Sequence, residues 1–79
     1  MTYKERQEES LYMLTTAQSA FETNIGQTQK DLQIYGELLT LAEDEFKKRE
    51  WDNVMDTCRE IFKLKRSIIE RLSKQEEMF

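Results

Sequence analysis

Apolar side chains recur every three or four residues along most of the chain, which is the spacing of one face of an α-helix. The first run, Leu11, Leu14, Ala17, Phe21 and Ile25, predicts an N-terminal helix over about 3–25. A second run contains Leu32, Tyr35, Leu39, Ala42 and Phe46, and a third contains Val54, Met55, Cys58, Ile61, Phe62, Ile68, Ile69 and Leu72. The third run is wide enough to touch two neighbours, so we predict an all-α fold with the last helix as its central packing element.

The best-marked boundary lies between the second and third runs. Lys47, Lys48 and Arg49 place cations in a last helical turn, where the helix dipole favours them, and Asp52 is a suitable N-cap for the next helix. These signals predict an antiparallel helical hairpin with helices over about 28–49 and 52–77. Trp51 lies at the joint, where its large ring can cover the end of the hairpin.

The segment around Gly26 leaves two arrangements open. In one, Gly26 ends the first helix in the left-handed conformation, and Thr28 and Asp31 form a weak capping box for the second, which gives a three-helix bundle. In the other, Leu11 to Phe46 keep one heptad frame, and one helix of about 40 residues, about 60 Å long, needs a partner and forms a coiled-coil oligomer. An internal glycine costs such a helix only about 1 kcal/mol relative to alanine, so both arrangements stay open.

Length and composition predict a single small domain over residues 1–79 with a thin core. A chain of 79 residues buries only about 60–65% of the surface that its unfolded form exposes. Residues 1–10 and 74–79 are expected to fray. No apolar run approaches the roughly 20 residues of a membrane helix, and the first ten residues lack the apolar stretch of a signal peptide. We therefore expect no membrane association and a cytoplasmic location, and the single cysteine, Cys58, fits a reducing compartment.

The net charge of −4 is divided unevenly along the chain. Residues 1–46 hold three basic and nine acidic side chains (net −6), whereas residues 47–79 hold nine basic and seven acidic ones (net +2). Two interpretations remain. The basic part can simply complement the acidic part within the hairpin, or Arg59, Lys63, Lys65 and Arg66 can form a basic docking face.

Candidate chemistry is sparse. The chain has no histidine, so the usual general base and most zinc sites are missing, and its two glycines lie too far from each other for a phosphate-binding loop. Glu43, Asp44 and Glu45 are neighbours in sequence and point to different sides of a helix, so they do not converge on a metal ion. Cys58 lies on an apolar stripe, which is typical of a small core residue. We predict that the protein is not an enzyme and has no cofactor, and the acidic balance disfavours nucleic acid as a partner.

Two resemblances involve residues 35–72. The set Leu38, Leu41, Ala42, Phe46, Trp51, Asp52, Val54, Cys58, Ile61 and Phe62 resembles one tetratricopeptide-like (TPR-like) helical hairpin, with Arg49 in place of the corner glycine. The set Leu38, Leu39, Leu41, Ala42, Glu50, Trp51 and Asp52 is similar to a segment of flagellar (type III) export chaperones of the FliT and FlgN kind, small helical proteins that hold axial subunits before secretion. The gap between Ala42 and Glu50 is longer than in the chaperone pattern by about one helical turn.

Three functional hypotheses follow. The first is a non-catalytic protein-interaction module that binds a partner through helix–helix contacts, which the chaperone resemblance implies. The second is a small inhibitor or regulator of a larger enzyme or polymerase, of the kind that phages encode, and the third is a self-assembling structural coiled coil. The candidate partner contacts are Tyr12, Met13, Trp51, Met55, Arg59, Lys63 and Arg66, together with Met78.

Overall fold

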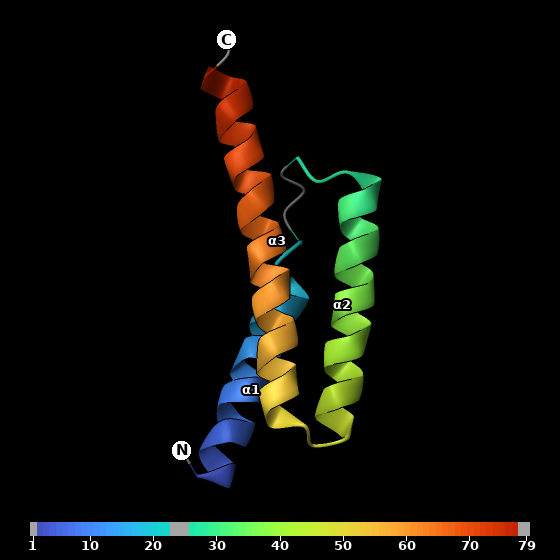
Figure 1. Ribbon diagram of the computed structural model, residues 1–79, viewed down its shortest axis with the longest axis vertical. Helices are drawn as coiled ribbons and strands as arrows, with labels where there is room; N and C mark the ends of the chain where they lie inside the picture. Colours follow the sequence, from blue (N-terminus) through green and yellow to red (C-terminus); the bar gives the residue numbers. More distant parts are fainter. Residues whose placement is uncertain (1, 23–25, 78–79) are drawn as a thin grey trace.

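The computed structural model describes residues 2–22 and 26–77, with side chains described as far as Lys74. This part of the chain forms three helices and no strand (Figure 1). The helices are α1 (Tyr3–Ser19), α2 (Gln29–Lys47) and α3 (Trp51–Glu77). The predicted all-α fold is therefore confirmed, and of the two arrangements that the sequence left open the chain adopts the three-helix one.

Helix α3 lies between the other two helices and packs against both of them (Figure 1). Helix α2 runs antiparallel to α3, as predicted for the hairpin, whereas α1 runs in the same direction as α3. Contacts at the two ends of α1 fix its position against α3 and α2. The ring of Tyr3 lies 5.8 Å from the ring of Trp51 at the start of α3, and the hydroxyl of Tyr35 on α2 donates to the carbonyl of Ala17.

The core forms where the three helices meet. Its buried members are Leu14 and Ala17 of α1, Ala42 of α2, and Val54, Cys58 and Ile61 of α3. Partly buried side chains surround them: Met13, Ala20, Phe21, Tyr35, Leu38, Leu39, Phe46 and Phe62. Half of the six buried members come from α3, which accords with its expected role as the central packing element.

The end of α1 differs from the prediction. The helix ends at Ser19 with Ala20 as its C-cap, not near residue 25. The hydroxyls of Thr15, Thr16 and Ser19 all bond to backbone carbonyls three or four residues earlier. Such side chains compete with the backbone and are poor helix formers, which is a physical reason for the early end. Asn24 and Ile25, which the prediction placed in this helix, lie outside the described residues.

Gly26 does not cap α1, although it adopts the predicted left-handed conformation with φ +66°. It lies instead against α3, where a Cβ atom on Gly26 would come within 2.5 Å of Leu72 Cδ2. The capping box of α2 is confirmed, because Thr28 Oγ1 accepts from the N–H of Asp31 at 3.1 Å and Asp31 accepts from the N–H of Thr28 at 2.9 Å. These features break the chain between α1 and α2 and exclude the single long helix.

The hairpin corner is a Schellman motif. The N–H of Glu50 donates to the carbonyl of Glu45 at 3.0 Å, and the N–H of Arg49 donates to the carbonyl of Phe46 at 3.0 Å. Arg49 occupies the position that glycine usually takes, with φ +62°. The predicted N-cap is wrong by two positions: α3 begins at Trp51, so Asp52 lies inside the first turn and Glu50 precedes the helix.

Candidate protein-interaction surface

Two apolar stripes of α2 and α3 lie side by side between two polar bridges. Along α2 the row is Asp31, Ile34, Leu38, Leu41 and Glu45, and along the antiparallel α3 it is Arg71, Ile68, Leu64, Ile61 and Thr57. Spacings of three and four residues keep each row on one side of its helix. The end members pair across the helices, so the six apolar members face the same seam. We call them the α2/α3 apolar face.

The first bridge joins Arg71 to Asp31. The Arg71 Nη2 lies 2.7 Å from Asp31 Oδ2, and it also donates to the carbonyl of Gly26 at 3.3 Å. The backbone N–H of Thr28, followed by the Arg71 guanidinium, lowers the pKa of the Asp31 carboxyl below its usual value. One arginine therefore ties α3 to both the connection before α2 and the first turn of α2.

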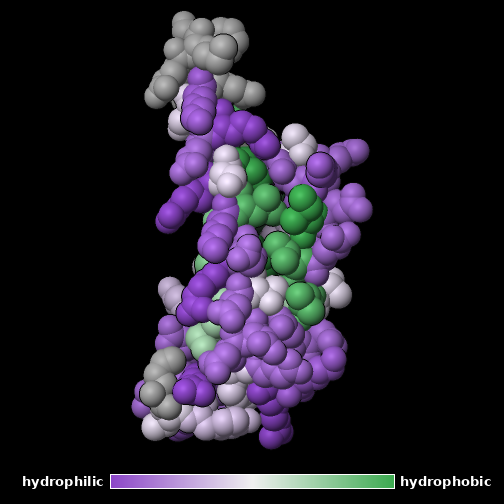
Figure 2. All heavy atoms as spheres, viewed as in Figure 1, coloured by the Kyte–Doolittle hydropathy of each residue, from purple (hydrophilic) through white to green (hydrophobic). Residues whose placement is uncertain are grey.

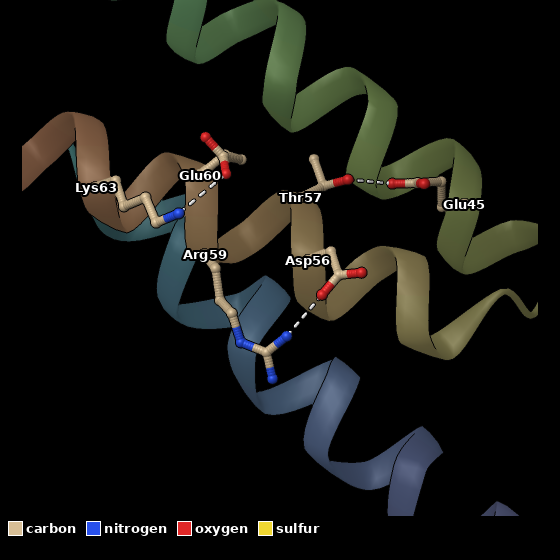
Figure 3. Close-up of polar contacts among 6 residues, drawn as sticks. All are labelled: Glu45, Asp56, Thr57, Arg59, Glu60 and Lys63. Atoms are coloured by element: carbon tan, nitrogen blue, oxygen red, sulfur yellow. Dashed lines mark hydrogen bonds and ion pairs between the residues drawn. The ribbon is translucent and has the colours of Figure 1, made fainter.

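The second bridge lies near the hairpin corner, where the hydroxyl of Thr57 donates to Oε1 of Glu45 (Figure 3). Thr57 is 7% exposed and Glu45 is partly buried. Together the two bridges set the register of α2 against α3 at both ends of the apolar face.

The apolar face has a buried floor and an exposed edge. Ile61 and Ile68 are buried, Ile34, Leu38 and Leu64 are partly buried, and Leu41 is 49% exposed. Figure 2 shows hydrophobic side chains gathered over the seam between α2 and α3, in the view in which α1 passes behind α3 in Figure 1. Helix α1 therefore covers the back of the hairpin and leaves this side open.

The seven candidate contacts predicted from the sequence do not form one site. Trp51 and Met55 are core residues, 6% and 5% exposed. Met13 packs against the core, whereas Tyr12 is 72% exposed on the outer side of α1. Arg59, Lys63 and Arg66 are exposed on α3, and Met78 lies outside the described residues.

The predicted basic docking face on α3 consists of Arg59, Lys63, Lys65 and Arg66. Acidic residues of the same helix partly neutralise it. Arg59 pairs with Asp56 at 2.7 Å, and Lys63 pairs with Glu60 at 3.3 Å. Figure 3 shows Arg59 extending on the side of α3 that lies toward α1, whereas Thr57 points toward α2. Arg59 and Thr57 therefore lie on different sides of α3.

Sequence reasoning missed most of the apolar face. Ile34, Leu41 and Leu64 lie beside the main stripes, and none of them was a candidate contact. A signal was present, because each of these helices carries a second apolar row next to its core row. The rows alone do not show which of them a neighbouring helix covers.

A polar hollow lies at the hairpin corner. It is lined by Tyr3, Arg6, Arg49, Glu50, Trp51, Asp52 and Asn53. Two polar contacts cross it: Arg6 lies 3.6 Å from Asp52, and Asn53 donates to Glu50 at 2.8 Å. Nε1 of Trp51 is buried and has no hydrogen-bond partner in the described part of the chain.

Cys58 is fully buried, as predicted for a core residue. Burial, followed by the nearby charge of Glu45, raises the pKa of the Cys58 thiol to about 11. The thiol is therefore protonated at neutral pH and contributes packing. Residues 2–22 and 26–77 contain no cluster of three or more side chains able to hold a metal ion.

The chain matches no known family model, no curated protein and no solved structure. Among the described residues, no helix combines the length and the apolar character needed to cross a bilayer.

Proposed function

We propose that the protein is a non-catalytic interaction module that binds helices of a partner protein on the α2/α3 apolar face. The observation that carries this proposal is the open seam between two helices whose register is set by the Asp31–Arg71 and Glu45–Thr57 bridges. A helix laid along such a seam meets apolar side chains at spacings of three and four residues, as in other helix-in-groove complexes.

The energetics favour covering this face. Full burial of a leucine or isoleucine side chain contributes about 1.5–3 kcal/mol, and Leu41 still exposes 49% of its surface. Ile34, Leu38 and Leu64 also retain part of their surface. A partner helix would remove all four from water without moving the backbone of the hairpin, so little of the gain would be lost to rearrangement.

The resemblance to export chaperones agrees with this proposal, because those proteins hold other proteins through helical surfaces. It supplies no partner for this chain by itself.

A second candidate function is a regulator that caps a larger enzyme or polymerase. It is favoured by a hollow on α1 lined by Glu5, Glu8, Glu9 and Tyr12, of which Tyr12 is 72% exposed. Three carboxylates beside an exposed aromatic ring would suit a basic surface. This function would use the outer side of α1 and leave Leu41 free.

Site-specific photo-crosslinking separates the two candidates. A benzophenone amino acid is placed at Leu41, at Leu11 or at Tyr12 in the cells that express the protein. Leu41 and Leu11 are a matched pair because each is 49% exposed, but only Leu41 lies on the apolar face.

We expect a discrete adduct from position 41 and none from position 11. A discrete adduct from position 12 alone would favour the regulator. Equal labelling from all three positions would contradict a specific surface of either kind.

A further inference from the structure

We infer that the occupant of the α2/α3 apolar face is a second copy of this chain, seated face to face so that the two hairpins form a two-layer bundle of four helices. This inference rests on the proposed function, since it names the partner of the same surface. Two hairpins joined in this way make a four-helix bundle core with an α1 on each outer side.

The single chain exposes more surface than a compact monomer of its mass, which favours association. The chain exposes 5933 Å², whereas a compact monomer of 9.5 kDa exposes about 5,000 Å². The single chain therefore leaves roughly 900 Å² more surface in water than a compact monomer of its mass does.

The shape agrees with the area. The radius of gyration is 14.2 Å, against about 11.6 Å expected for a compact domain of this length. The principal extents of 50 × 23 × 16 Å describe a thin, elongated molecule. Stacking a second copy on its open face would thicken the shortest dimension and make the assembly more compact.

A row of charged side chains beside the apolar face complements the same row of a second copy when the two rows run antiparallel. Lys30, Glu37 and Asp44 repeat every seven residues, so they form one row along α2. This row borders the apolar face, because Lys30 precedes Ile34 by four residues and Glu37 precedes Leu41 by four. Asp44 already pairs with Lys48 of its own helix at 3.0 Å, but its side chain is 52% exposed, so its carboxylate can also accept from a second lysine. If the two α2 helices meet antiparallel about Glu37, Lys30 of each copy lies beside Asp44 of the other.

The α3 side of the face adds little net charge. Glu60 and Lys63 pair with each other at 3.3 Å, and Arg71 is already paired with Asp31. A partner of strongly positive or negative charge therefore finds no complementary rim here. A second copy brings two Lys30–Asp44 pairs and places Glu37 opposite its own symmetry mate, so Glu37 limits the affinity.

The first test is the mass in solution, measured by light scattering and by sedimentation equilibrium over a range of concentrations. We expect the wild-type chain to have twice its mass of 9.5 kDa. Leu41→Asp should raise the dissociation constant roughly 100-fold, tenfold for each copy, because a carboxylate is buried at the seam. Leu11→Asp, the matched control, should leave the dimer intact.

The second test is a charge exchange. Lys30→Glu and Asp44→Lys should each raise the dissociation constant roughly 3- to 30-fold, since each turns two attractive contacts into repulsive ones. The double variant Lys30→Glu/Asp44→Lys should restore the wild-type value. Circular dichroism checks that every variant keeps its helices. Failure of the double variant to recover would overturn the antiparallel pairing.

The outcomes separate this inference from the proposed function. A wild-type chain that stays monomeric, together with a cross-link from position 41 to a different protein, would overturn the second copy and leave the interaction surface standing. A monomer with no cross-link from position 41 would overturn both. Loss of the dimer in Leu11→Asp as much as in Leu41→Asp would place the contact elsewhere.

Discussion

Replacement of Trp51 by alanine should remove a large part of the stability of the fold. The Trp51 side chain is only 6% exposed, and its ring packs edge to face against Tyr3 at 5.8 Å and Phe46 at 5.1 Å. It therefore joins α1, the end of α2 and the start of α3. A buried tryptophan covers about 150–250 Å², and its truncation to alanine costs roughly 3–5 kcal/mol, including the cavity that remains.

This loss is large for a chain of 79 residues, whose stability is expected to be roughly 4–12 kcal/mol. The measurement is urea denaturation followed by far-UV circular dichroism, which does not depend on the tryptophan itself. Tyr12→Ala is the control, because Tyr12 is 72% exposed and its truncation should change stability by less than about 0.5 kcal/mol.

Trp51→Phe sharpens the test. Phenylalanine keeps most of the ring contacts and removes the buried Nε1–H that finds no partner, a group whose burial costs about 1–3 kcal/mol. The lost ring area costs about 1 kcal/mol, so we expect a net change within about 1 kcal/mol. If Trp51→Ala destabilised the chain no more than Tyr12→Ala does, the assignment of Trp51 to the core would be wrong.

Three further predictions concern the corner, the first bridge and the cysteine. Arg49→Gly should raise the free energy of unfolding by about 0.5–1 kcal/mol, roughly 2–8 °C in melting temperature, because glycine takes the left-handed conformation at φ +62° without strain. If Arg49→Gly melted no higher than Arg49→Ala, this reasoning would be refuted. The Thr28 N–H, followed by the Arg71 guanidinium, lowers the pKa of Asp31 in the folded state, so the stabilising effect of the carboxylate should be complete above about pH 5 and disappear as the pH falls through the lowered value. The urea midpoints of the wild type and Asp31→Asn should therefore converge in acid, and a constant difference would contradict the lowered pKa of Asp31. The Cys58 thiol has a pKa of about 11 and no exposed surface. At pH 8 it should therefore react with a thiol reagent at least roughly 100-fold more slowly in the native protein than in the urea-unfolded protein. Equal rates would show that the core opens easily around Cys58.

The features that the sequence determined by itself are local. Apolar spacing predicts helices along the chain, although it left open whether residues 11–49 form one helix or two. The capping box of Thr28 and Asp31 follows from two side chains three residues apart. The hairpin corner follows from the break in that spacing and from the cations before it. Local signals fixed the end of α1 poorly, because hydroxyl side chains stop a helix gradually and without a single cap residue.

Only the tertiary structure decided which apolar side chains are covered. Helices α2 and α3 each carry more apolar positions than one neighbour can bury, and the sequence does not say on which side α1 docks. Once α1 packs behind α3, Met55 and Trp51 become core and Leu41 becomes surface. Likewise, the Arg71–Asp31 bridge joins residues 40 positions apart, which no local pattern announces. Burial depends on contacts between distant segments, so the candidate surface could be found only after the helices were placed in space.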